Sequence, residues 1–333
     1  MKEAGIELKD TSMNFLLDGN IHRFATSQDE GTERSGYYKI FFDKSPAGIF
    51  GDWRQGIKEK WHMTGNSRLS YDEWLKLKHE QEEKIRKAER IKKEQYRAAT
   101  QQALEIFKNC PVVTASDNIP YLTIKNRSVN SVLAYQNEAL KPRLYQGGLM
   151  FGLFDSSTGN FQSYQSMYLD SKGKPCKRIA KGTPLKGACY CFNSVNNVDN
   201  NDRIILIVEG IFTGLSVWEH LNFEFQVFAC MSCYNMFDVL QGLRKKYASA
   251  TFIILADNDF EKEHNAGIYT AQSMINRGMA DSFIAPNFKE WDSGCSDFED
   301  YFNLYQSWPD KIEAMKQQIL TKIERIKRGK YHE

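Results

Sequence analysis

Acidic side chains follow two strongly apolar segments of the sequence. Glu209 comes directly after Ile204–Val208, and Asp257 and Asp259 come directly after Thr251–Ala256. If both segments are parallel strands, their carboxyl ends meet at the edge of the sheet where ligands bind. Aspartates two positions apart can converge on one divalent ion, and Mg²⁺ prefers such oxygen ligands with retained waters. The pattern predicts a site for Mg²⁺ or Mn²⁺, with Glu209 as an acid/base group or a further ligand.

A third acidic group, Asp297 and Asp300, follows the last predicted strand. These carboxylates could supply ligands to a second metal ion. A helix N-cap explains either residue equally well, because aspartate is favoured at that position. The two interpretations stay open at this point.

The elements around the carboxylates follow from the pattern of apolar residues. The two apolar runs that precede them are nearly continuous, which is typical of parallel strands buried on both faces. Helical spacing predicts helices over about 212–221, 236–247 and 265–277. Residues 204–285 are therefore expected to form a β-α-β-α-β-α-β unit with a parallel sheet.

Upstream of this unit the chain changes character. Short apolar runs separated by turn signals predict a small β module within 13–66. A long helix of mixed charge then runs to about Lys108; it is interpreted as a solvated connector, with a nucleic-acid-binding face as the alternative. Three strands are predicted at 148–154, 161–169 and 188–192. The expected multi-domain α/β and α+β organisation is a small β-rich module at 1–66, a connector helix at 67–108, a basic α+β subdomain at 109–200, a Rossmann-like parallel sheet at 201–306 and a basic C-terminal helix at 307–333.

The charge of the chain is unevenly distributed. Lys and Arg (44) nearly balance Asp and Glu (42), which gives a net charge of +2. Residues 141–187 nevertheless carry +6, residues 202–300 carry −8 and residues 311–333 carry +4. An acidic segment between basic flanks favours carboxylates gathered for metal ions beside surfaces for polyanions. Chance variation in solvated surface charge is the alternative.

Composition excludes several classes of protein. Hydrophobic residues at 41% and charged residues at 26% exclude a wholly disordered or fibrous chain. The apolar runs are far shorter than the ~20 residues of a spanning helix, and the acidic opening does not fit a signal peptide, so we expect a cytoplasmic protein with no membrane partner. The seven cysteines do not predict a disulfide framework, and the pairs Cys189/Cys191 and Cys230/Cys233 do not match a standard zinc spacing. We expect structural thiols and no zinc.

The carboxylate segments also resemble a known domain. Val208-Glu209-Gly210 followed by Ala256-Asp257-Asn258-Asp259 resembles the Toprim domain that bacterial-type primases, topoisomerases and several nucleases share. The sequences of Glu209–Ser216 and Ser296–Asp300 are similar to segments of the primases of phages, plasmids and conjugative elements. Residues 148–177 resemble the basic subdomain that precedes Toprim in those primases.

The resemblance implies roles for particular residues. Glu209 would be the catalytic acid/base, with Asp257 and Asp259 as Mg²⁺ ligands and Asp297 and Asp300 as further ligands. Many primases have aspartate four residues after the glutamate, whereas this chain has threonine there, as in the mobile-element branch. Template and nucleotide contacts would come from basic side chains in loops, although such side chains are usually just solvated. The candidates for these contacts are Arg143, Lys177 and Arg178.

Two residues of the N-terminal module are further candidates for contact with nucleic acid. Trp53 and Arg54 could stack on unpaired bases, and a tryptophan packed inside the module is the alternative.

The implied function is a DNA primase. Such a nucleotidyltransferase would use Mg²⁺ or Mn²⁺ to synthesise short oligonucleotide primers on single-stranded DNA for phage or mobile-element replication. Its partners would be the template strand and nucleoside triphosphates, with a replicative helicase as a further candidate. The alternatives are a Toprim nuclease and a non-catalytic nucleic-acid-binding accessory protein. The basic subdomain favours a primase over a nuclease, and the intact carboxylates disfavour an accessory role.

Overall fold

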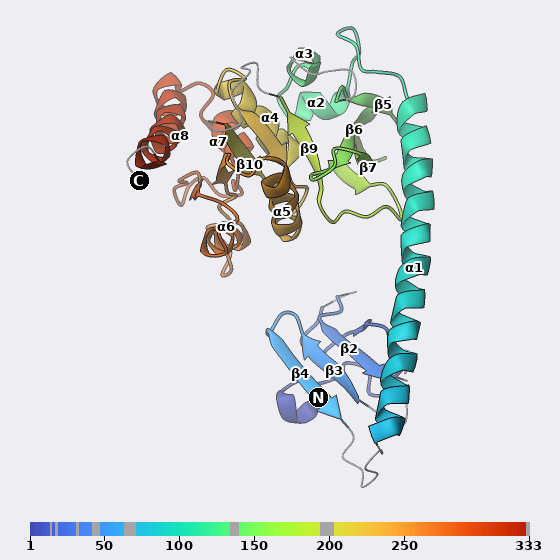
Figure 1. Ribbon diagram of the computed structural model, residues 1–333. Helices are drawn as coiled ribbons and strands as arrows, with labels where there is room; N and C mark the ends of the chain where they lie inside the picture. The colour runs from blue at the N-terminus through green and yellow to red at the C-terminus, as the bar shows by residue number, and fades with distance from the viewer. Residues whose placement is uncertain are drawn as a thin grey trace. The chain divides into compact units, whose positions relative to one another are not determined.

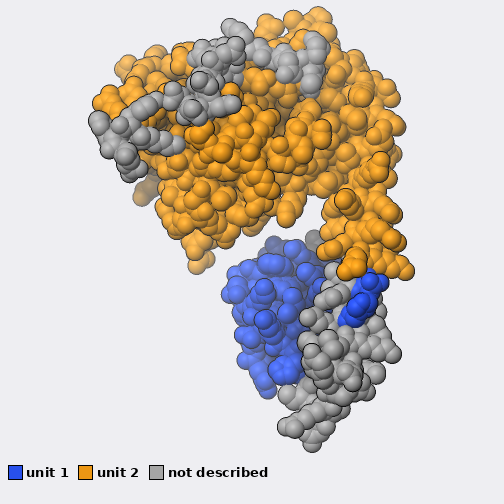
Figure 2. All heavy atoms as spheres, in the orientation of Figure 1, with its two compact units in different colours: residues 1–84 blue, residues 85–333 orange. Residues whose placement is uncertain are grey.

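The computed structural model describes residues 1–13, 15–16, 19–30, 33–41, 47–62, 71–133, 140–193 and 203–330. They form two compact units, an N-terminal unit of residues 1–84 and a C-terminal unit of residues 85–333 (Figure 2). The predicted mixed α/β class is confirmed, since helices cover both faces of a sheet in the C-terminal unit. None of the helices described is long and apolar enough to cross a membrane.

The N-terminal unit contains a small antiparallel sheet. In its described residues four strands lie in the order β1-β2-β3-β4, with a 3₁₀ turn at Lys2–Ala4 before them. Ile6, Phe24 and Tyr38 form the centre of its apolar core. The strands are β1 (His22–Phe24), β2 (Gly36–Phe41), β3 (Ala47–Asp52) and β4 (Ile57–His62).

Helix α1 (Tyr71–Asn109) is 39 residues long and contributes to both units (Figure 1). The side chains described over residues 86–95 are all exposed, which fits both a solvated connector and a nucleic-acid-binding face. Near its end Ala103 and Phe107 are buried against Met150 of the large sheet. Over the part of the helix whose side chains are described, apolar burial therefore fixes the last turns.

One mixed sheet runs through the C-terminal unit. In the described residues it has nine strands in the order β13-β12-β10-β11-β9-β6-β7-β8, with β5 paired to β6. Strands β10 to β13 are parallel, and β9 joins them to the antiparallel part by pairing with both β11 and β6. The basic and acidic segments of the sequence thus share one sheet. The strands are β5 (Arg143–Tyr145), β6 (Gly148–Asp155), β7 (Phe161–Leu169), β8 (Pro175–Ile179), β9 (Ala188–Phe192), β10 (Ile204–Val208), β11 (Gln226–Ala229), β12 (Thr251–Leu255) and β13 (Ser282–Ile284).

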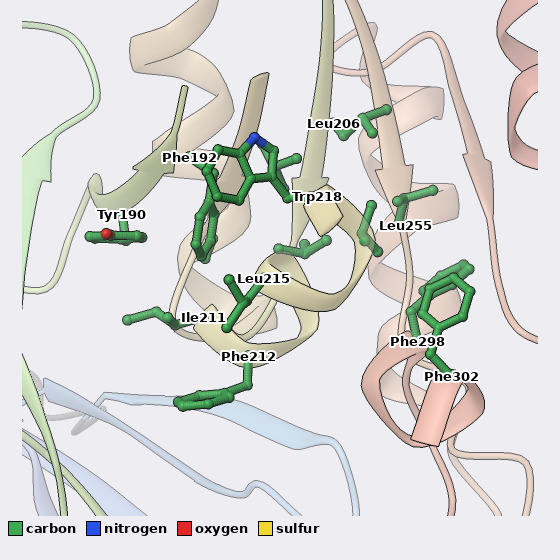
Figure 3. Close-up of a cluster of buried hydrophobic side chains, with 14 of the residues drawn as sticks. Tyr190, Phe192, Leu206, Ile211, Phe212, Leu215, Trp218, Leu255, Phe298 and Phe302 are labelled. Atoms are coloured by element: carbon green, nitrogen blue, oxygen red, sulfur yellow. The ribbon is translucent and has the colours of Figure 1, made fainter. Parts of the chain in front are cut away.

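Helices cover both faces of the parallel part. Leu206 and Leu255 face a core that also holds Phe298 and Phe302 (Figure 3). Residues at the alternate positions, such as Ile207, face α5 and α6. Strands β10 and β12 are thus buried on both faces, as predicted. The helices are α2 (Pro120–Ile124), α3 (Val129–Leu133), α4 (Ile211–His220), α5 (Met236–Lys246), α6 (Ala266–Asn276), α7 (Phe298–Leu304) and α8 (Pro309–Lys330), with a 3₁₀ turn, η3, at Cys233–Asn235.

Candidate active site

The site lies at the carboxyl edge of the parallel strands. Strands β10 and β12 are neighbours in parallel register, so Glu209 and Asp257 leave the sheet side by side. The chain runs from β10 to β11 on one side and, through α5, returns to β12 on the other side. Helix α4 packs on one face and α5 and α6 on the other. The strand order thus reverses between β10 and β12, where open α/β sheets bind ligands.

The loop after β11 holds Glu209 in place. The Met231 N–H donates a hydrogen bond of 2.8 Å to the Glu209 backbone oxygen, and the Cys233 N–H donates to the Glu209 carboxylate. Burial, and then the neighbouring Asp259, raise the pKa of Glu209, while Lys177 opposes the rise. A carboxyl whose pKa moves toward neutral becomes better suited to accept and release a proton.

Asp257 is a strongly perturbed carboxyl of the site. Burial, the largest cause, and the nearby Asp297 and Glu209 raise its pKa to about 8. Its buried Oδ1 atom has no hydrogen-bond partner among the described residues. Such a carboxyl holds a proton near neutral pH unless a cation takes its place. The Asp257 carboxylate is therefore suited to bind a cation.

The loop that carries Asp257 is fixed by hydrogen bonds of the next residue. The Asn258 N–H donates to the Ser296 carbonyl at 2.6 Å, and its side-chain amide donates to the Pro286 carbonyl at 2.7 Å. Asn265, which caps α6, donates to the Asn258 side chain at 2.7 Å. These contacts join the loops after β12 and β13, so the carboxylates of both loops have defined positions.

Asp259, the partner of Asp257 in the sequence pattern, is partly exposed. The Lys262 ammonium lies 2.9 Å from its Oδ1 atom, at the surface. An exposed ion pair of this kind contributes little to stability. The Asp259 carboxylate therefore has access to solvent and to a ligand.

Asp297 and Asp300 cap helix α7. The Asp300 N–H donates to Asp297 Oδ1 at 2.9 Å, and Asp300 accepts from the Ser296 and Asp297 N–H groups. The N-cap interpretation is thus confirmed for Asp297, and Asp300 is the third helical residue, which completes a capping box. Burial, followed by Asp300, raises the pKa of Asp297, and Thr213 and Lys125 act in the opposite direction. Because Asp297 also raises the pKa of Asp257, it is part of the same electrostatic cluster.

The donor set fits a magnesium-like ion. Among the residues described, no three His, Cys, Asp or Glu side chains are already arranged around one ion position. Mg²⁺ is usually held by one or two carboxylates, its own waters and substrate phosphates. Asp257, with its orphan oxygen, and the accessible Asp259 meet that requirement, and Asp297 is a further candidate. "Acidic cluster" below means Glu209, Asp257, Asp259 and Asp297.

The basic residues predicted in loops lie on strands instead. Lys177 and Arg178 are adjacent on β8, so their side chains point to opposite faces of the sheet. Arg178 shares a face with Met150, which packs on α1, whereas Lys177 shares the other face with Met167. Lys177 is electrostatically coupled to Glu209. Of the two residues, Lys177 therefore lies on the face of the sheet opposite α1.

Arg143 supports the end of α1. Its guanidinium lies 5.2 Å from the centre of the Phe107 ring and donates to the Cys110 carbonyl at 3.4 Å. The side chain is partly buried on β5. These contacts give Arg143 a packing role that the sequence did not predict.

Trp53 and Arg54 differ sharply in their surroundings. Trp53 lies against Tyr37, with 4.5 Å between ring centres, and is 59% exposed, so the packed-core alternative is wrong. The Arg54 guanidinium is 2.6 Å from Glu33 and 3.1 Å from Asp29. Trp53 thus keeps an exposed ring between Tyr37 and the Arg23 guanidinium, which lies 5.9 Å from its centre, while Arg54 forms ion pairs with neighbouring acidic residues.

Sequence reasoning missed a basic residue next to the cluster. The Lys125 ammonium lies 3.0 Å from Glu299, a buried acid on α7, and lowers the pKa of Asp297. The two partners are 174 positions apart, so no local pattern could pair them. Lys125 balances part of the negative charge around α7.

Comparison with known proteins relates the chain to primases. It is 24% identical to DNA primase TraC of Escherichia coli over 270 residues, which are 80% of this chain and 24% of TraC. The chain thus spans about a quarter of the length of the curated relative it matches. No protein-family model matches.

Three solved primase structures are also similar to the chain, at TM-scores below 0.4. The primase fragment of the bacteriophage T7 primase-helicase has a TM-score of 0.39 at 12% identity and covers 61% of this chain and 78% of its own. The DnaG primase catalytic domain bound to ssDNA has a TM-score of 0.39 at 13% sequence identity, and the match covers 67% of this chain and 82% of that domain. A DNA primase domain from Pseudomonas aeruginosa has a TM-score of 0.36 at 14% sequence identity, and the match covers 56% of this chain and 57% of that domain. The resemblance to DNA primases that the sequence predicted is confirmed by the sequence similarity to TraC.

Proposed function

We propose that the chain is a Toprim-type DNA primase. It uses Mg²⁺ or Mn²⁺ to join nucleotides into short primers on single-stranded DNA, in the replication of a plasmid, phage or conjugative element. The observation that carries the proposal is the acidic cluster at the switch between β10 and β12, with Asp257 buried and without a partner for Oδ1 among the described residues. The similarity to DNA primase TraC agrees with it.

The residues of the cluster divide the work of phosphoryl transfer. A divalent ion there would activate the attacking 3′ oxygen and offset the charge that develops on the leaving pyrophosphate. Asp257 and Asp259 would hold that ion, with Asp297 beside them. Glu209 accepts the proton of the attacking hydroxyl, a role for which its raised pKa suits it.

The strand would be bound by basic and aromatic side chains. The positive charge of Lys177 lowers the pKa of Glu209, and we propose that this side chain binds phosphates of the nucleotide or template. Trp53 offers an exposed ring to unpaired bases. A replicative helicase that delivers single-stranded DNA is the partner we propose.

One assay tests the proposal directly. The full chain is incubated with labelled ribo- or deoxyribonucleotides, single-stranded DNA and Mg²⁺, and both short products and template cleavage are measured. We expect the wild type to make short products. The rate of primer synthesis should be ~10²–10⁴-fold lower in Glu209→Gln. Asp310→Asn, an exposed acid on α8, serves as the matched control and should keep full activity.

Other results of the assay would point elsewhere. Template cleavage that depends on Glu209, without products, would make the protein a Toprim nuclease. A folded protein that binds the strand but neither joins nor cleaves would make it an accessory protein.

A further inference from the structure

An exposed aromatic residue directly follows the residue whose N–H donates to the Glu209 carboxylate. Tyr234 is 89% exposed, although it follows Cys233, whose N–H donates to that carboxylate. Burying an aromatic ring is normally favourable. A ring left in water at the edge of a candidate active site therefore needs a reason.

The loop that presents Tyr234 is rigid. Asn235 is buried, and its side-chain amide accepts from the Gly187 N–H at 2.8 Å and donates to the Ala188 and Cys230 carbonyls at 2.8 and 2.9 Å. On the other side of Tyr234, the Cys233 thiol is hydrogen bonded to the Thr270 hydroxyl of α6. Buried neighbours on both sides hold the backbone of Tyr234, so its exposure is not that of a loose loop.

The same loop contains backbone strain. Met231 has a φ of +67°, a left-handed conformation that is uncommon for a side chain of this size. Its N–H nevertheless donates to the Glu209 carbonyl at 2.8 Å. Strained residues persist where the surroundings fix them, and they cluster at ligand sites. The conformation of Met231 therefore shows that its surroundings fix this loop.

A second aromatic group lies nearby on α6. Tyr269 is 70% exposed and precedes Thr270, the partner of Cys233. The His264 ring lies 5.3 Å from the Tyr269 ring. Two exposed tyrosines thus adjoin the hydrogen-bonded pair Cys233 and Thr270, and Cys233 also donates to Glu209.

We propose that Tyr234, supported by Tyr269, is a stacking platform for a nucleobase whose phosphates are bound at the acidic cluster. The inference rests on the proposed function, because it takes the ligand of the cluster to be a nucleotide. An aromatic face fits any base, so the platform provides affinity without sequence preference. The base belongs either to the incoming nucleoside triphosphate or to the template strand.

The test compares variants of Tyr234 in the full chain. Tyr234→Ala removes the ring, Tyr234→Phe keeps it and Tyr234→Leu keeps apolar bulk without an aromatic face. Trp308→Ala is the matched control, because Trp308 is another exposed aromatic residue and lies just before α8. Affinity for a fluorescent nucleoside triphosphate and for a single-stranded oligonucleotide is titrated with Mg²⁺, and the KM for nucleotide is measured during primer synthesis.

We expect Tyr234→Ala and Tyr234→Leu to lower the affinity for one of the two ligands by roughly 5- to 100-fold. Tyr234→Phe and Trp308→Ala should bind as the wild type does. A change for the triphosphate assigns the base to the incoming nucleotide, and a change for the oligonucleotide assigns it to the template. Wild-type affinity of Tyr234→Ala for both ligands would overturn the inference. Because binding is measured apart from synthesis, a wild type that binds nucleotide without joining it would refute the primase proposal alone.

Discussion

The Thr213 hydroxyl donates a hydrogen bond of 2.8 Å to the Asp297 carboxylate. Thr213 lies in the first turn of α4, four residues after Glu209, and Asp297 is the N-cap of α7. The bond therefore ties the loop after β10 to the loop before α7. It also explains what the threonine does at a position where many primases have an acid.

Replacing Thr213 tests this link. Thr213→Val removes the hydroxyl that lowers the pKa of Asp297, so that pKa should rise further. A higher pKa keeps Asp297 protonated to higher pH, so the pH at which primer synthesis reaches half its maximum should move upward. At pH values below this midpoint, primer synthesis by Thr213→Val should be about 10-fold slower than by the wild type, as expected for the loss of a hydrogen bond to a charged group. Thr213→Ser should behave as the wild type, and an unchanged pH profile in Thr213→Val would contradict the role.

Lys177 and Arg178 should have separable effects because they lie on opposite faces of β8. Lys177→Ala should weaken binding of single-stranded DNA and reduce its salt dependence by ~0.7 slope units for each lost phosphate contact. Arg178→Ala should change both quantities less, since its side chain shares the α1 face. Lys172→Ala, in the exposed turn before β8, is the control. Equal effects of Lys177→Ala and Arg178→Ala on the salt slope would show that the faces do not separate them.

Trp53 and Arg54 should likewise separate binding from folding. Trp53→Ala should weaken binding of single-stranded DNA roughly 5- to 100-fold through the loss of one stacked base while leaving the melting temperature near that of the wild type. Arg54→Ala should lower the melting temperature, because Glu33 and the buried Asp29 lose their ion-pair partner. Fluorescence anisotropy and thermal melting measure the two effects. Normal affinity in Trp53→Ala would remove that ring from the binding surface.

The stability of the metal-free protein should depend on pH through Asp257. Its pKa is about 8 in the folded protein and ~3.9 when unfolded, so the folded state holds a proton that the unfolded state has lost. Stability is therefore full below pH ~4 and decreases as the pH rises to about 8. Burial raises the pKa of Glu209 and Asp297 as well, which acts in the same direction. Asp257→Asn should reduce this slope in EDTA, measured by thermal melting; a slope equal to that of the wild type would contradict it.

The central elements and carboxylates could be predicted because their signals are local. Buried parallel strands are continuous apolar runs, and Glu209 and Asp257 follow such runs directly. Strand β8 gave no such signal, since Pro175–Ile179 is polar and largely exposed. Lys177 and Arg178 therefore looked like loop residues.

Contacts between distant segments could not be predicted. Thr213 and Asp297 are 84 positions apart, and their hydrogen bond depends on how α4 and α7 pack. The same holds for β9, which pairs with β6 and β11 and joins two segments of opposite charge into one sheet. Such contacts depend on how the elements pack in three dimensions, and the periodicity of apolar residues along the chain does not predict that packing.

Thermal melting with and without Mg²⁺ tests most directly whether the acidic cluster is a catalytic metal site. Binding to the folded state raises the melting temperature, so Mg²⁺ should stabilise the wild type. The double variant Asp257→Asn/Asp259→Asn loses both the repulsion and the ligands. It should melt no lower than the metal-free wild type, stop responding to Mg²⁺ and lose nucleotide joining. A wild type that does not respond to Mg²⁺, together with a clearly destabilised double variant, would show that these aspartates are structural and would contradict the account.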